Sequence, residues 1–125
     1  MANSDGSMDS LLDVFLYESS QLNDQLVDII LHSEESKSLS SEEVNEIFRI
    51  MHTIKGSSAL MNYSQLSTVA HRVEDLFYYI REKKPQIEYD SLCDIVLSAS
   101  DYIKEQLETI SEGNTPNADN SAVLA

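Results

Sequence analysis

The chain has 125 residues, which is enough for one domain but hardly for two. Eight Lys and Arg against 22 Asp and Glu give a formal net charge of −14, which disfavours binding to nucleic acid or to an anionic membrane. Three glycines and two prolines leave few turn residues and no clustered glycines for a phosphate-binding loop, so we predict an all-α domain without a nucleotide site. No apolar run is long enough to insert into a membrane, and the single Cys93 favours a reducing, cytoplasmic setting.

Residues 1–7 are small and polar without periodicity, and we expect them to lie outside the fold as a flexible N-terminus or a remnant. From Met8 onward, apolar residues recur at steps of three and four, which predicts a long amphipathic helix that fades around Leu31 to Glu35. The sequence from Ser40 to Glu43 forms a capping box that starts a second helix. This helix should stop at Asn62, because asparagine tolerates the left-handed conformation of a helix end.

A third apolar stripe runs from Leu66 to Ile80 and is followed by basic residues and Pro85, which end a helix. A fourth stripe runs from about Tyr89 to Ile110. Four helices with short connections predict an antiparallel up-and-down four-helix bundle over residues 8–111. We expect residues 112–125 to form a flexible linker or tail.

The second helix carries an unusual combination of residues. His52, Lys55 and Gly56 share one stripe at the edge of the apolar face, because residues three and four positions apart are neighbours on a helix. Glycine inside an exposed helix costs about 0.5–1 kcal/mol relative to alanine. We expect Gly56, together with Ser57 and Ala59, to leave room for another protein beside His52. The alternative is close packing against a neighbouring helix of the same bundle.

Basic residues gather around the same stripe. Arg49, Lys55 and Arg72 are three of only eight basic residues, and we expect a local positive patch that could steady a phosphoryl group. In the alternative interpretation, Arg49 and Lys55 only solvate the outer face of the helix.

The third helix adds His71 and Glu74, three positions apart and offset from the core stripe. An adjacent antiparallel helix could bring them to His52. A carboxylate bonded to one imidazole nitrogen would fix the neutral tautomer and leave the lone pair of the other nitrogen pointing outward as a nucleophile. Glu74 is therefore the predicted orienting residue, whereas His71 taken alone fits an ordinary half-buried histidine better.

His52, His71 and Glu74 could also serve as three metal ligands. Neither an HExxH motif nor the paired Glu-x-x-His motifs of di-iron bundles are present, and Lys55 would repel a cation. We therefore expect no metal site. The absence of a GxSxG motif likewise leaves Ser/His/Asp catalysis without support.

The segment from Arg49 to Ala59, with His-x-x-Lys-Gly at its centre, is followed 19 residues after His52 by His71-Arg72-Val73-Glu74. These motifs resemble the histidine phosphotransfer (HPt) domain family, and most closely the N-terminal phosphotransfer domains of chemotaxis histidine kinases of the CheA type. The resemblance covers residues 8–111. It implies that His52 is phosphorylated, that Lys55 and His71 belong to its hydrogen-bonding surround, and that Glu74 orients its ring.

Two features depart from the family pattern. Asn62 stands where the family usually has glycine, which we interpret as a tolerated substitution at a helix end. The family's domain can also end in a short extra C-terminal helix, and the linker-like sequence after Ser111 puts that helix in doubt here.

The resemblance implies a phosphocarrier domain. His52 would accept the phosphoryl group of ATP bound with Mg²⁺ on a separate histidine kinase catalytic domain, and would pass it to an aspartate of a response regulator receiver domain. The chain itself would need no cofactor. Two alternatives are a stand-alone phosphorelay HPt protein, which receives its phosphoryl group from a receiver domain, and a helical adaptor in which His52 stays unmodified.

Overall fold

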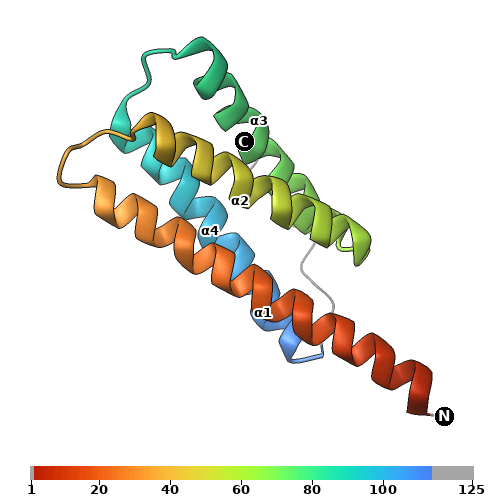
Figure 1. Ribbon diagram of the computed structural model, residues 1–125. Coiled ribbons are helices and arrows are strands. Elements are labelled where there is room, and N and C mark those ends of the chain that lie inside the picture. Colours follow the sequence, from red (N-terminus) through yellow and green to blue (C-terminus); the bar gives the residue numbers. More distant parts are fainter. Residues whose placement is uncertain (1, 114–125) are drawn as a thin grey trace.

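The computed structural model of the protein describes residues 2–113, with side chains from residue 10 onward. This part of the chain forms four helices and no strand: α1 (Ala2–Ser33), α2 (Ser41–Leu60), α3 (Ser64–Lys83) and α4 (Tyr89–Ser111). Successive helices run in opposite directions, and α1 also packs against α4, which closes the bundle (Figure 1). The predicted antiparallel four-helix bundle is therefore confirmed. The most extensive helix contact is that between α2 and α3.

Local signals at the ends of α2 and α3 act as the sequence predicts. Ser40 Oγ accepts the Glu43 backbone N–H at 3.1 Å, and Glu43 Oε1 accepts the Ser40 backbone N–H at 2.8 Å. The second of these bonds is the main reason why the pKa of Glu43 lies below its usual value. Asn62 adopts the left-handed conformation with φ 66°, and Lys84 does so after α3 with φ 48°.

The core consists of apolar side chains from all four helices, on the stripes that helical periodicity predicts. Its fully buried members include Leu26, Ile30, Ile47, Met51, Ile54, Leu66, Val69, Phe77, Val96 and Ile103. One buried polar pair crosses from α1 to α4: Asn23 Nδ2 donates to the Ser100 carbonyl at 3.2 Å, and Ser100 Oγ donates to Asn23 Oδ1 at 3.0 Å. Because these groups satisfy each other, they fix the axial register of the two helices at little net cost. Cys93 is buried and unpaired, as expected for a small apolar residue.

The first helix begins earlier than the sequence predicts. We expected residues 1–7 to lie outside the fold and a helix to start at Met8, but α1 begins at Ala2, so Gly6 lies within a helix. Once a helix has nucleated, each further residue adds a backbone hydrogen bond, so small polar residues can extend it without an apolar stripe. Figure 1 shows this end of α1 projecting past its neighbours. Most of the predicted tail, and any extra C-terminal helix, falls in residues 114–125, outside the described residues.

The capping box allows a test of what starts α2. Ser40→Ala should lower the free energy of unfolding by about 1 kcal/mol, because the Glu43 backbone N–H loses its acceptor. Urea denaturation followed by circular dichroism measures the change. The neighbouring exposed Ser41→Ala is the matched control and should change stability by less than about 0.5 kcal/mol. Equal effects of the two variants would show that the cap contributes nothing.

Candidate functional site

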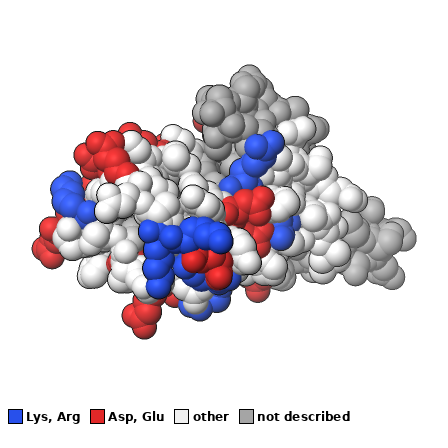
Figure 2. Space-filling view, turned by 90° about the horizontal axis from the view of Figure 1, so that it is seen from above, with Lys and Arg blue, Asp and Glu red and all other residues white. Residues whose placement is uncertain are grey.

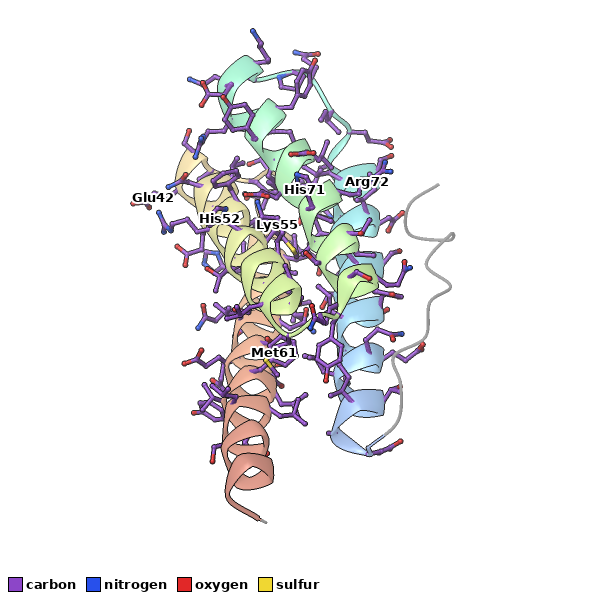
Figure 3. The ribbon with its side chains drawn as sticks, turned by 90° about the vertical axis from the view of Figure 1, so that its right-hand side faces the viewer. Glu42, His52, Lys55, Met61, His71 and Arg72 are labelled. Carbon is purple, nitrogen blue, oxygen red and sulfur yellow. The ribbon has the colours of Figure 1, made fainter. Side chains whose placement is uncertain are left out.

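The predicted site lies on the outer boundary between α2 and α3. His52 and Lys55 come from α2, and His71 and Glu74 come from α3. Figure 3 shows Lys55 between His52 and His71, with Arg72 farther across α3. Because the two helices run antiparallel and share the largest contact of the bundle, residues 19 to 22 positions apart in sequence meet side by side.

His52 and Glu74 are joined by the predicted hydrogen bond. Nδ1 of the imidazole lies 2.6 Å from Glu74 Oε2. The Glu74 side chain is only 7% exposed, whereas the His52 side chain is 63% exposed. A carboxylate only accepts, so the neutral ring carries its proton on Nδ1 and its lone pair on Nε2. The arrangement therefore offers a nucleophilic nitrogen on a ring that solvent and other proteins can reach.

Lys55 binds the second oxygen of the same carboxylate. Its Nζ lies 2.8 Å from Glu74 Oε1. Burial alone would raise the pKa of Glu74, but the hydrogen bonds and charges of Lys55 and His52 outweigh burial and hold this pKa below its usual value. Glu74 is consequently ionised at neutral pH, so its carboxylate can accept the Nδ1 proton.

The other predicted basic residues differ in their surroundings, and the ion pairs of His71 and Arg49 are with acids rather than with His52. His71 Nε2 lies 3.4 Å from Asp75 Oδ1, one turn along α3, and its side chain is half exposed. Arg72 is two residues from Glu74, so helical geometry directs it to a different side of α3. Arg49 Nη2 pairs with Glu46 Oε1 at 2.9 Å on the surface.

Two of the three cations expected to form a positive patch are paired with acids, which weakens that patch. Figure 2 views the bundle from above and shows Asp and Glu side chains beside the Lys and Arg side chains on that face. Of the three cations predicted to form the patch, Arg49 and Lys55 each have an acidic partner. Because Arg49 and Lys55 are paired with acids, the geometry does not favour the prediction that free cations on this chain steady a phosphoryl group.

Gly56 opens the surface beside His52, one turn further along α2. A Cβ atom built at Gly56 would meet no atom within 4 Å, so close packing against a neighbouring helix does not explain this glycine. Ser57 is half-buried, Ala59 is exposed, and Leu60 is 83% exposed. Among the described residues, the surface of α2 beyond His52 is therefore free of a bulky side chain at Gly56 and is partly apolar.

Phe48 on α2 contacts the site, which the sequence motifs did not predict. The Phe48 and His52 rings stack with centroids 6.2 Å apart and planes inclined by 18°. Phe48 precedes His52 by one helical turn, and this spacing was the available signal. Ser67 was also missed: its Oγ donates to the Lys55 carbonyl at 2.9 Å and ties α3 to α2 beside the site.

The metal-binding alternative finds little support in residues 10–113. The potential ligands that converge there are His71, Glu74 and Asp75, whose ligand atoms lie within 4.8 Å of one another. Glu74 already binds His52 and Lys55, and the ammonium group of Lys55 would repel a divalent cation.

None of the helices in the described part of the chain has the length and apolar character that crossing a bilayer requires.

Comparison with known proteins identifies similar chains. The model of the Hpt domain family matches residues 10–113. Chemotaxis protein CheA of Borreliella burgdorferi is 43% identical over 99 residues, which cover 79% of this chain and 11% of that protein. CheA of Treponema pallidum is 35% identical over 121 residues, covering 97% and 15%, and CheA of Bacillus subtilis is 32% identical over 118 residues, covering 94% and 17%. The chain therefore spans less than a fifth of the length of these relatives.

The lowered pKa of Glu74 predicts how the site responds to acid. A carboxyl group whose pKa is lower in the folded than in the unfolded state stabilises the fold above the ordinary value of 4.5, and this stabilisation is lost as pH falls through the folded-state pKa. The free energy of unfolding of the wild type, minus that of Glu74→Gln, should therefore be constant above the ordinary value of 4.5 and decline as the pH is lowered below it. Urea denaturation of both proteins at each pH measures this difference in the free energy of unfolding.

Glu105→Gln on α4, an exposed carboxylate, is the control for this pH series. It should show a much smaller pH-dependent difference, because a solvated carboxylate has a similar environment in both states. A flat difference for Glu74→Gln across the same range would contradict the ion-paired state of Glu74.

Proposed function

Because the chain belongs to the Hpt domain family, we propose that His52 is the phosphoryl-accepting residue of a chemotaxis phosphocarrier domain. The phosphoryl group comes from ATP held with Mg²⁺ on a separate histidine kinase catalytic domain. His52 then transfers this group to an aspartate on a response regulator receiver domain. The parent protein is then a histidine kinase of the CheA type, in which this chain is the carrier and supplies no nucleotide site.

The observation that supports this proposal most strongly is the bond between His52 Nδ1 and Glu74 on a ring that remains largely exposed. The Nε2 lone pair attacks the γ-phosphorus, the bond from phosphorus to the β,γ-bridging oxygen breaks, and ADP leaves with that electron pair. The imidazole gains positive charge in this step. Glu74 stabilises that charge through the Nδ1 proton, in a buried position where the interaction is strong.

Onward transfer reverses the flow of electrons at nitrogen. A carboxylate oxygen of the receiver domain attacks the phosphorus, the N–P bond breaks, and its electron pair returns to Nε2. The product imidazole is again neutral with its proton on Nδ1, facing Glu74. The carrier thus needs no proton exchange with solvent in either direction.

The remaining predicted site residues have supporting roles in this proposal. Lys55 acts through Glu74, which it keeps ionised. His71 borders the site on α3 and is paired with Asp75. Arg49, Gly56, Ser57 and Ala59 form the α2 surface against which the kinase domain and the receiver domain dock in turn.

The nucleophile assignment has a direct test. His52→Gln should reduce labelling from γ-³²P-ATP and a CheA-type kinase domain by at least about 100-fold, because glutamine lacks the imidazole nitrogen that attacks phosphorus while Glu74 holds the Nδ1 edge of the ring. Circular dichroism should stay helical, since the side chain is mostly exposed. His32→Gln, at an exposed histidine near the end of α1, is the control and should label normally. Undiminished labelling of His52→Gln would reject the assignment.

The docking surface is tested by two substitutions of Gly56. Gly56→Ala should raise the free energy of unfolding by about 0.5–1 kcal/mol, because its Cβ meets nothing and alanine is the better helix former. Gly56→Arg should keep the helix but slow transfer to a receiver domain about tenfold, because the long side chain blocks the open surface. Stopped-flow transfer rates measure the difference. Equal rates for the two variants would show that partners do not approach Gly56.

A further inference from the structure

One hydrogen bond is not enough to hold an imidazole ring in a single orientation. The His52 side chain turns about two torsions, and its bond to Glu74 constrains only the Nδ1 edge. The ring is largely exposed, so the bundle core does not pack both of its faces. Rotation about the torsion that this bond leaves free would turn Nε2 away from the direction from which a partner's phosphoryl group approaches. A second contact is therefore needed to fix the plane of the ring.

Phe48 supplies a contact to one face of that ring. It lies four residues before His52, on the same side of α2, and the two planes differ by only 18° at a centroid distance of 6.2 Å. This distance lies within the range of offset stacked aromatic pairs. Phe48 is itself half-buried and packs against the core, so it is a firmer support than an exposed side chain would be.

Phe48 is held from the opposite helix by a cation and a second ring. The Arg81 guanidinium lies 4.4 Å from the Phe48 ring centroid and 5.3 Å from that of Tyr78. The Tyr78 ring lies 6.2 Å from Phe48 at an angle of 42°. Cations near aromatic faces are attracted to the ring quadrupole, so Arg81 draws α3 onto Phe48.

Arg81 has its own anchors. Its Nη1 donates to Asn45 Oδ1 at 3.0 Å, and its Nε donates to Glu82 Oε2 at 3.2 Å. Asn45 lies one turn before Phe48 on α2, so Arg81 bonds α2 at the same level at which it contacts the ring. The contacts form a continuous path from Asn45 through Arg81 and Phe48 to His52.

We infer that Phe48, clamped by Arg81 and Tyr78, is a positioning residue that fixes the plane of the His52 imidazole and so directs Nε2 outward. This inference rests on the proposed function, because it assigns Phe48 a role in the phosphorylation of His52. Glu74 sets which nitrogen is the nucleophile, and the Phe48 clamp, comprising Phe48, Tyr78 and Arg81, sets where that nitrogen points.

The test measures phosphorylation of the whole chain by ATP, Mg²⁺ and a CheA-type kinase domain over a range of carrier concentrations. Phe48→Leu keeps an apolar side chain but removes the ring, and should lower kcat about two- to tenfold with KM nearly unchanged. Phe48→Tyr should restore kcat to within about twofold, because it keeps the stacked ring. A raised KM with unchanged kcat would make Phe48 a docking contact and overturn the positioning role.

Two adjacent tyrosines provide a matched pair that does not disturb the core. Tyr78 and Tyr79 are 52% and 51% exposed, but only Tyr78 takes part in the ring contacts with Phe48 and Arg81. Tyr78→Ala should lower kcat about twofold or more, whereas Tyr79→Ala should leave it unchanged. Equal kcat for the two variants would contradict the clamp.

A spectroscopic readout separates positioning from general destabilisation. In Phe48→Leu, the His52 Nδ1 proton should exchange with water about two- to tenfold faster by NMR, because the ring visits orientations that break the bond to Glu74. Unchanged exchange together with unchanged kcat would overturn the inference while leaving His52 as the phosphorylated residue. Persistent labelling of His52→Gln would instead reject the proposed function itself.

Discussion

The buried carboxylate of Glu74 is the group on which the rest of the site depends. A charge with little access to water is costly unless other groups compensate it, and each Glu74 oxygen has one partner: His52 at Oε2 and Lys55 at Oε1. Both partners belong to α2, whereas Glu74 belongs to α3. The same interaction therefore joins the two helices, keeps the carboxylate ionised and sets the tautomer of the histidine. Replacing His52 or Lys55 leaves the buried Glu74 charge without full compensation, whereas replacing Glu74 leaves both α2 residues without their partner.

The bundle serves as a rigid support for this small set of contacts. The capping box at Ser40 fixes where α2 begins, and the left-handed Asn62 turns the chain so that α3 returns alongside it. The buried Asn23 and Ser100 pair sets the register on the opposite side of the bundle. On the outer face, Arg49 and Lys55 pair with acids, so the surface near His52 offers shape and apolar area more than net positive charge. Partners would then recognise the open surface at Gly56, which lacks a side chain, more than a basic patch.

Local sequence signals predict most of the fold and the central contact of the site. Both ends of α2 and the C-terminal end of α3 agree with the capping box, Asn62 and Pro85, because these residues act on their own neighbours. The early start of α1 could not be predicted, since residues 2–7 show no periodicity. The meeting of His52 and Glu74 follows from two stripes on antiparallel neighbours. The Lys55 ion pair, the separation of Arg72 and the Phe48 clamp depend on the register and rotamers of α2 and α3, which periodicity leaves undefined.

Nitrogen-15 and phosphorus-31 NMR of the imidazole-labelled protein tests the central claim most directly. In the unphosphorylated chain at neutral pH, the neutral His52 ring should carry its proton on Nδ1, bonded to Glu74. After phosphorylation, the phosphorus should couple to Nε2. A neutral ring protonated on Nε2, or a phosphoryl group attached to Nδ1, would contradict the account.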